Sequence, residues 1–391
     1  MNGLPKLEEY LKRSEGPELF KTVSPDGSYV KFKYSDYTTY NLKWDPVTLN
    51  ARGHVFRLSD GQCVLRPWNK FFNYGELRTE TGEPTKLYGM LKSFPGLEPL
   101  ETFEGPLTAT DKLDGSLCIA GIVDGALMST TSGAFTAWQG GWANVWLIDH
   151  GVHTRMVPGY TYLFEIICDR DLHPIRYDFE GCVLLGIIDN ATGEERPYAD
   201  LQKFAEACGI RVTERVELGS FKEIVDFVRN LPASKEGLVL TYPSGFKVKV
   251  KGPEFLKVQK VFHSLSEKSL LDGFSPEKED FPEEIRLKVP EEFKELRDFM
   301  DSYALKFRVT VDLFKQFAGE AVRMGYSGRE LYDFACETFK SNGRLVDPAV
   351  KFGRKSVKEG RVELGDGVRK NIHESMVKQW KDTKNENDCR D

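Results

Sequence analysis

The chain of 391 residues contains no run approaching the roughly 18 apolar residues that a membrane helix needs. Its seven cysteines are scattered without a C-x-x-C pair, which argues against a zinc knuckle and against a disulfide framework. The first residues, MNGLPKLEEYLKRSEG, lack the apolar core of a signal peptide and predict a short polar helix. Internal repeats are missing too. From these absences we expect a soluble protein with no membrane partner in a reducing, cytoplasmic setting.

The charge balance excludes one further class. A net charge of −6 argues against wholesale coating of nucleic acid. It leaves room for a local basic groove, because binding depends on the lysines at the contact and not on the total charge. The histidines at 150, 153 and 173 show no metal-ligand spacing.

The texture of the sequence changes once along the chain. Residues from about 20 to 255 alternate in short apolar runs separated by Asp-Gly turns, which is typical of strands with interspersed helices. After about residue 262, helical spacing dominates in 290–307, in 327–343 and in 367–381. We therefore expect an α+β domain over residues 1–262 and an all-α domain over 263–391. For the second helix, Ser327 and Glu330 have capping-box spacing and Gly343 is the expected end.

The stretch 109-ATDKLDGSLCIAG-121 places a lone lysine, Lys112, in an otherwise apolar run just before Asp114 and Gly115. One interpretation is a hairpin turn with a solvated lysine beside it, because Asp-Gly is a common turn signal. The other is a nucleophilic lysine that takes a nucleotide onto its nitrogen. This stretch alone does not decide between them.

A second candidate stretch is 236-EGLVLTYPSGFKVKVKGPEF-255. Glu236 opens an apolar strand, and a second strand follows the turn. The period of two puts Lys247, Lys249 and Lys251 on one face of that second strand. The alternatives are a solvated strand face and the lining of an anionic pocket.

Three more features stand in unusual surroundings. Glu165 lies within an apolar run, where a carboxylate is costly to bury without a partner such as a sugar hydroxyl, a metal, or the arginines 170 or 176. Arg52 and Lys70 flank a predicted hairpin, and Phe71 and Phe72 adjoin the lysine, which suits a nucleotide's phosphates and base. Tryptophans 138, 142 and 146 share one helical face, where core packing is favoured over stacking on RNA bases.

Taken in order, these stretches resemble the covalent nucleotidyltransferase superfamily, which holds ATP-dependent DNA and RNA ligases and capping guanylyltransferases. Within it the chain resembles most the bacteriophage tRNA-repair ligases, the RNA ligase 1 family. The resemblance is carried by 52-RGHVF-56, 66-RPWNKFFN-73, 112-KLDGSL-117, the spacing from Glu236 to Lys249 and Lys251, and the helical tail.

The resemblance implies a nucleotidyltransferase domain of antiparallel sheets with flanking helices, related to ATP-grasp ligases, and an all-α C-terminal domain that could select the RNA. It implies ATP and Mg²⁺ or Mn²⁺ as cofactors, and single-stranded RNA or nicked tRNA with 5′-phosphate and 3′-hydroxyl ends as partners. We expect a monomer, working in the host cytoplasm if phage-encoded.

The same resemblance assigns roles. Lys112 would attack the α-phosphate of ATP and keep AMP on its nitrogen. Glu236 would hold the metal, while Lys249 and Lys251 would lower the pKa of Lys112 and neutralise the phosphate. The remaining expected nucleotide contacts are Arg52 and Lys70 at the triphosphate, Glu165 at a ribose hydroxyl, Val239 and Phe255 around the adenine, Phe72 and Asp114, and Gly115 where the backbone passes the nucleotide.

Two departures from the family pattern stand out. Ser132 occupies a position where the family usually has a basic residue, and the stretch around Arg176 matches only with a shift. Alternatives to an RNA ligase are a capping guanylyltransferase or a DNA ligase, which usually append a β-barrel where this chain turns helical. A catalytically silent nucleotide- or RNA-binding module is the third, against which the intact lysines and Glu236 argue.

Overall fold

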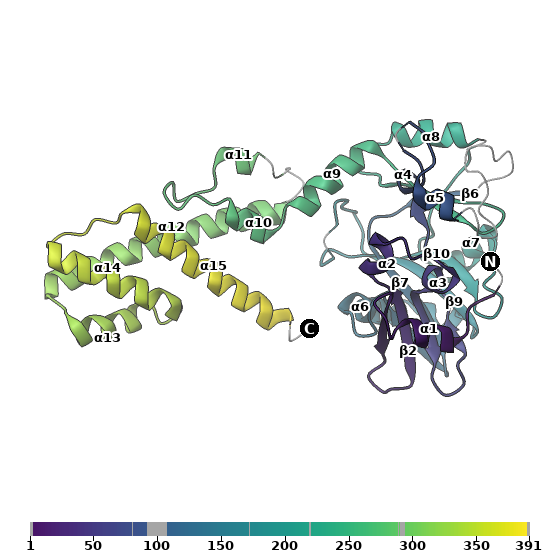
Figure 1. The fold of residues 1–391 in the computed structure, drawn as a ribbon, viewed down its shortest axis with the longest axis horizontal. Coiled ribbons are helices and arrows are strands. Elements are labelled where there is room, and N and C mark those ends of the chain that lie inside the picture. The colour runs from purple at the N-terminus through teal and green to yellow at the C-terminus, as the bar shows by residue number, and fades with distance from the viewer. Residues whose placement is uncertain are drawn as a thin grey trace. The chain divides into compact units, whose positions relative to one another are not determined.

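The chain divides into two compact units, residues 1–259 and 260–391, near the predicted change after residue 262. The computed structural model describes residues 3–79, 81–91, 108–171, 173–218, 220–287, 289 and 294–388. Figure 1 shows strands gathered in the first unit and helices alone in the second. Within these described ranges, no helix has the length and apolar character needed to cross a bilayer.

Three sheets form the first unit. The first is antiparallel in the order β1-β2-β3-β4, with β1 Leu19–Val23, β2 Tyr29–Tyr34, β3 Arg52–Arg57 and β4 Cys63–Leu65. The second is antiparallel in the order β10-β9-β7-β8, with β7 Ser116–Val123, β8 Ala126–Thr130, β9 Tyr160–Ile167 and β10 Gly181–Asp189. The third has the order β11-β6-β12-β13-β5, with β5 Phe72–Asn73, β6 Thr108–Lys112, β11 Arg215–Val216, β12 Gly237–Thr241 and β13 Lys247–Lys251. Only the short pair β13–β5 is parallel among the described strands.

Helices and one 3₁₀ turn flank these sheets. They are α1 Leu7–Arg13, α2 Asp36–Tyr40, α3 Pro46–Asn50, α4 Tyr74–Leu77, α5 Lys86–Leu91, α6 Trp138–Asp149, η1 Val152–Arg155, α7 Tyr198–Cys208 and α8 Phe221–Arg229. The helix α9, Pro253–Ser264, follows the last strand and runs past the boundary between the units.

Apolar alternation along the strands builds separate cores. Side chains of the first two sheets, Val55 and Leu65 on one and Ile119 and Leu163 on the other, pack face to face. The other face of the second sheet is covered by α6 and α7, and the tryptophans of α6 pack against that core. The preference for core packing over an RNA-stacking face at these tryptophans is therefore confirmed.

The turn at Asp124-Gly125 shows how the sequence sets the strand register. Both residues have positive φ, 49° and 84°, which is the geometry of a two-residue hairpin turn whose twist matches the flanking strands. It joins β7 to β8 directly after the predicted apolar run, so that Val123 pairs with Ala126. The register fixes which side chains of β7 lie on each face of the second sheet.

The second unit is helical, as expected. Its elements are α10 Glu267–Asp272, α11 Glu283–Arg286, α12 Lys294–Met324, α13 Gly328–Thr338, η2 Gly343–Leu345, α14 Val346–Glu359 and α15 Asp366–Asp388. An aromatic core holds the longest helix, with Phe274 packed against Tyr303, Phe307 and His373 at ring separations of 5.1, 4.9 and 5.2 Å.

Two helix predictions needed correction, and one helix was not predicted. The helix predicted over 290–307 runs on to Met324, because apolar residues continue at helical spacing; Pro290 lies outside the described residues. The helix after Ser327 starts as predicted, but the serine side chain makes no capping hydrogen bond and the helix ends at Thr338. Gly343 instead begins a 3₁₀ turn, and α14 was not predicted as a helix.

Candidate active site

The third sheet forms the floor of a cavity of about 900 Å³. Pairing of β6, β12 and β13 aligns their residues in rows across the sheet. The three rows are Lys112–Gly237–Lys251, then Thr110–Val239–Lys249, then Thr108–Thr241–Lys247. Because side chains two residues apart share a face of a strand, all three rows present the same face. Residues from the second sheet and the 66–71 segment complete the walls.

The two lysines of the first row, Lys112 and Lys251, are joined by ion pairs to the same carboxylate, that of Glu236. Lys112 Nζ donates to Glu236 Oε2 at 2.7 Å, and Lys251 Nζ lies 3.0 Å from the other oxygen, Oε1. The glutamate side chain is only 2% exposed, whereas Lys112 retains 20%. A buried carboxylate between two ammonium groups is fully compensated, and Lys112 remains accessible from the cavity.

Two glycines make this link fit. A Cβ on Gly237 would lie 2.0 Å from the Val250 carbonyl oxygen, so the residue after Glu236 has to be glycine. A Cβ on Gly115 would lie 2.4 Å from the carbonyl oxygen of Ile166 in β9. The crowding at Gly115 comes from the neighbouring strand; that the backbone also passes close to a nucleotide here stays a prediction.

Arg52 and Lys70 both line the cavity. The Arg52 guanidinium lies over the Phe71 ring at 4.6 Å, and its buried Nη1 has no hydrogen-bond partner among the described residues. Burial lowers the pKa of Arg52 from its ordinary value. An unpaired buried donor of this kind can be satisfied by a bound anion.

Phe71, not Phe72, faces the cavity. Phe72 is 1% exposed and packs in a core, with its ring edge on Trp44 at 5.3 Å. Its contact with the site is indirect, because Lys70 Nζ lies 4.9 Å above the Phe72 ring. Phe71 immediately precedes β5 and Phe72 begins it, and these two consecutive side chains point to opposite sides of the chain.

Lys249 sits in the middle row within a cluster of cations. Burial lowers its pKa to about 6, and the charges of Arg52, Lys70, Lys112 and Lys251 lower it in the same direction. The ammonium also lies 4.9 Å from the Phe71 ring. A cavity that holds this much positive charge in a desolvated setting attracts polyanions.

Glu165 is the acid on the opposite wall, contributed by β9. Burial raises its pKa to about 7; its charged neighbours are Lys112 and His173, which lower the pKa, and Glu236 and Asp114, which raise it. A desolvated carboxylate that titrates near neutrality and faces a cavity is typical of a functional site.

Asp114 is held by protein groups. Its carboxylate accepts the Ile175 backbone N–H at 3.1 Å, and its own N–H donates to Tyr177 Oη at 2.9 Å. His173 lies between Asp114 and Asp171, at 3.6 and 3.0 Å. Although burial opposes the charge, these two carboxylates raise the pKa of His173 to about 10. The residues after Lys112 are thus tied to the 171–177 segment.

The two residues expected around an adenine lie in different places. Val239 is in the middle of the floor and lines the cavity. Phe255 is fully buried at the start of α9, under the Lys251 ammonium at 5.4 Å. Of the expected set, Lys112, Arg52, Lys70, Gly115, Glu165, Val239 and Lys249 line the cavity, and Glu236, Lys251, Asp114, Phe72 and Phe255 support it.

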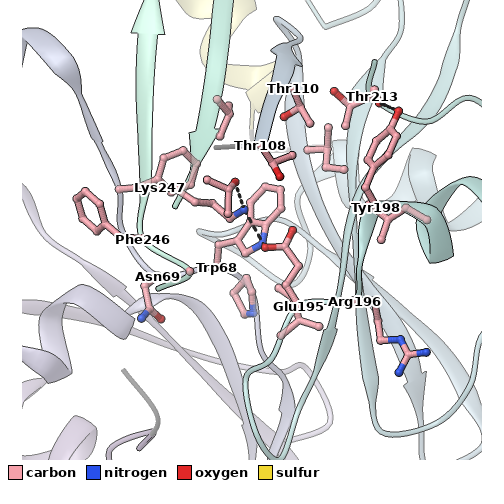
Figure 2. A pocket seen from close by; sticks show the side chains of 18 of the residues that line it. Trp68, Asn69, Thr108, Thr110, Glu195, Arg196, Tyr198, Thr213, Phe246 and Lys247 are labelled. Atoms are coloured by element: carbon pink, nitrogen blue, oxygen red, sulfur yellow. Dashed lines mark hydrogen bonds and ion pairs between the residues drawn. The ribbon is translucent and has the colours of Figure 1, made fainter. Parts of the chain in front are cut away.

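The sequence interpretation missed the third row. Lys247 is 7% exposed and lies 2.8 Å from Glu195 Oε2; it also donates to Thr241 Oγ1 at 2.7 Å. Its ammonium is 4.5 Å from the Trp68 ring. Figure 2 shows Lys247, Trp68 and Glu195 pointing toward one another at this end of the cavity. The alternation of lysines indicated that they share a face, but the partners come from distant loops.

The donor set fits a divalent cation only together with a bound polyphosphate. Among the described residues no three His, Cys, Asp or Glu side chains gather into a metal cage. Both oxygens of Glu236 already contact lysines. Mg²⁺ commonly binds through one or two carboxylates plus substrate phosphates and water, which one acidic residue beside a cationic cavity can satisfy.

Comparisons with known proteins agree with the sequence motifs. A family model described as RNA ligase matches residues 50–255, just over half of the chain. A Thermovibrio ammonificans protein provisionally named RNA ligase is 28% identical over 201 residues, 48% of this chain and 46% of that one. RNA ligase 1 of bacteriophage TS2126 is 30% identical over 129 residues, 32% and 28% of the two chains.

The chain thus spans less than half the length of these two relatives. The structure of an archaeal ATP-dependent RNA ligase matches 81% of this chain, and the match covers 80% of that protein at 14% identity and a TM-score of 0.44. The family match contains every cavity-lining residue of the predicted set, from Arg52 to Lys249. The chain belongs to the RNA ligase family of the phage RNA ligase 1 type.

Proposed function

We propose that the protein is an ATP-dependent RNA ligase that joins 5′-phosphate and 3′-hydroxyl RNA ends. The observation that carries the proposal is the position of Lys112: it is accessible at the end of a cavity whose lining also includes the cations Arg52, Lys70 and Lys249. A nucleophilic amine next to a site for a triphosphate is the arrangement that covalent nucleotidyl transfer requires.

In the first step, the Lys112 nitrogen attacks the α-phosphate of ATP. A P–N bond forms, the bond from the α-phosphorus to the bridging oxygen breaks, and pyrophosphate leaves with the electron pair. The bound phosphates favour the protonated form of Lys249, which then neutralises the charge that builds on the phosphate oxygens. Arg52 with its unpaired Nη1 receives the leaving pyrophosphate together with Lys70. Lys112 reacts as the free amine, so its ammonium must first lose a proton.

Glu236 would hold a Mg²⁺ or Mn²⁺ ion together with the phosphates of ATP. The ion supplies positive charge at the reacting phosphate. To take part, Glu236 has to release at least one of its two lysine contacts. Release of Lys112 would free the nucleophile at the moment when the nucleotide is in place.

Two further transfers complete the reaction. AMP passes from the Lys112 nitrogen to the 5′-phosphate of an RNA end, which regenerates the amine. The 3′-hydroxyl oxygen of the second end then attacks that phosphate and displaces AMP. Glu165 is the acceptor for a ribose hydroxyl in this scheme, and single-stranded RNA or a nicked tRNA is the substrate class.

The test is covalent labelling. The protein is incubated with α-labelled ATP or GTP and Mg²⁺ or Mn²⁺, then denatured. We expect AMP to remain on the wild-type chain and to be absent from Lys112→Ala, while Lys203→Ala, an exposed lysine of α7, labels normally. The Lys112→Ala protein should still seal RNA that carries a preformed 5′-adenylate.

Other results would replace the proposal. Retention of GMP instead of AMP would indicate a capping guanylyltransferase. No covalent label with either nucleotide would indicate a silent binding module. Sealing of nicked DNA in preference to RNA would indicate a DNA ligase built on the same core.

A further inference from the structure

The row Thr108–Thr241–Lys247 is the row of the cavity floor farthest from Lys112, and strand geometry gives the distance between them. Lys247 and Lys251 are the two ends of β13, four residues apart, and Lys251 pairs beside Lys112 through Gly237. At about 3.4 Å per residue, the Lys247 row is roughly 13 Å from the Lys112 row. An extended AMP attached to Lys112 spans a similar length, so its base reaches this end of the cavity.

The far end is a constructed polar wall. The Lys247 side chain is 7% exposed and is held between Glu195 and the Trp68 ring. The indole Nε1 of Trp68 is buried without a hydrogen-bond partner among the described residues. Glu195 keeps 27% of its side chain exposed to the cavity. An unpaired donor and an available carboxylate therefore stand side by side (Figure 2).

Gly186 keeps this wall in place. A Cβ at this position would lie 2.6 Å from Trp68 Cζ2 and 3.0 Å from Glu195 Oε1. Its φ is not in the left-handed region, so the glycine is needed for space and not for backbone conformation. The absence of a side chain at Gly186 in β10 thus leaves room for Trp68 and Glu195 to lie next to each other.

From this arrangement we infer that Trp68 and Glu195 select adenine: the indole N–H donates to N7 and the carboxylate accepts from the 6-amino group. Lys247 acts as a positioning residue that fixes the glutamate. Adenine presents an acceptor and a donor on this edge, whereas guanine presents two acceptors, N7 and O6. Guanine would therefore place O6 against a carboxylate. The inference rests on the proposed nucleotidyl transfer and names the residues that make the site prefer ATP over GTP.

The experiment compares wild type with Glu195→Gln, Glu195→Asp and Glu206→Gln. The glutamine keeps the shape but can donate to O6. The aspartate keeps the charge but withdraws it from the base. Glu206 is an exposed glutamate of α7 outside the cavity lining, and its substitution is the charge-matched control. Each full-length protein is titrated with ATP and with GTP in the presence of Mg²⁺, labelled covalently with each, and melted to check the fold.

We expect Glu195→Gln to shift the ATP-to-GTP preference toward GTP by about ten- to a hundredfold, the discrimination typical of one bidentate base contact. Glu195→Asp should weaken ATP binding without improving GTP binding, and Glu206→Gln should behave as wild type. Failure of Glu195→Gln to fold would leave the aspartate variant as the test.

Unchanged preference in folded Glu195 variants overturns the inference while Lys112 labelling by wild type stands. Absence of any labelling in wild type instead refutes the nucleotidyl transfer. In that case equal binding of ATP and GTP by wild type also overturns the base selection.

Discussion

The charged residues of the cavity and those of the helical unit behave as two different populations. At the edge of the cavity, Glu236 is 2% exposed and bridges Lys112 and Lys251, whose side chains are 20% and 15% exposed. In the helical unit, Arg329 and Asp333 form an ion pair one helical turn apart with side chains 85% and 57% exposed. Lys340 pairs with Glu337 in the same way.

The difference in exposure separates charges that serve a function from charges that only keep a surface solvated. Exposed pairs at helical spacing are screened by water and contribute little to stability. Buried charges cost desolvation energy, which a hydrophobic replacement would avoid, so a group of them around a cavity indicates a use for the charge. By this reasoning the chemistry belongs to the first unit, and the charges of α13 mainly keep a helix face solvated.

The contrast between buried and exposed charges predicts its largest effect on AMP transfer to Lys112. Glu236→Ala and Lys249→Ala should each slow labelling by about a hundredfold or more, because each removes a preorganised charge at the transferring phosphate. Arg329→Ala and Lys340→Ala should leave labelling unchanged. The measurement is the single-turnover rate of AMP uptake at saturating ATP.

Lys247→Ala sharpens the same comparison. The family spacing from Glu236 reaches only Lys249 and Lys251, so the resemblance by itself predicts that Lys247→Ala is nearly silent. Its burial and its contacts with Glu195 and Trp68 now predict a moderate loss, smaller than that of Lys249→Ala. If Lys247→Ala were the most damaging of the β13 variants, the assignment of Lys249 to the phosphate would be wrong.

How far the sequence could go is visible in these residues. Lys112, Glu236 and Lys249 could be proposed from the sequence because their spacing within short strands is local, and their catalytic roles stay predictions. The α+β and all-α parts were predicted from hydrophobic periodicity. Glu195 and Trp68 were not predicted as site residues, because each contacts Lys247 only through the packing of segments that are distant in the sequence. Phe72 was expected at the nucleotide in place of its neighbour Phe71, which lines the cavity. A strand of two residues is too short for alternation to show which side chain faces the cavity.

Glu165 provides a pH test of the buried population. Its pKa is raised to about 7, so the folded state binds a proton more tightly than the unfolded chain. The stability that this proton contributes is complete below about pH 4.5 and is lost as pH rises through 7. Between these values wild type should lose on the order of 2 kcal/mol of unfolding free energy relative to Glu165→Gln.

Labelling should show the opposite trend. If the ionised Glu165 accepts a ribose hydroxyl, AMP uptake by wild type should rise through pH 7, and the rise should be flattened in Glu165→Gln. Denaturant unfolding and labelling rates at matched pH values measure both effects. Parallel pH profiles for the two proteins would show that Glu165 does not titrate in this range.

Lys31 tests whether a buried charge can be purely structural. It is 1% exposed, donates to Thr131 O at 2.6 Å and Ala134 O at 3.1 Å, and does not line the cavity. Burial lowers its pKa to about 7, so stability should rise with pH between about 7 and 10.5, where only the unfolded chain stays protonated.

The expected gain for wild type relative to Lys31→Met is about 2 kcal/mol between pH 7 and 9. Urea unfolding at the two pH values measures it. AMP labelling at pH 7 should stay within severalfold of wild type as long as the variant is folded. A loss as large as that of Lys249→Ala would place Lys31 among the residues that shape the active site and would break the division between structural and functional burial.

The smallest effect on AMP uptake is expected from removing the helical unit altogether. Every residue assigned to the chemistry precedes residue 260, where the second unit begins. A chain ending near residue 262, if it remains soluble, should still label Lys112. It should discriminate poorly between a nicked tRNA and a generic single strand, because we expect the helical unit to contribute substrate choice.

The basic face of α14 is the part of that unit best suited to an RNA backbone. Val350 and Phe352 point into the core, while Lys351, Arg354 and Lys355 are exposed. Replacing these three with glutamine should leave AMP uptake intact and reduce the salt dependence of RNA binding, since fewer counterions are released. Lys340→Gln, in the turn after α13, is the control at an exposed lysine outside this face. An unchanged salt slope would mean that this face is merely solvated, and loss of AMP uptake in the shortened chain would make the helical unit part of the catalytic scaffold.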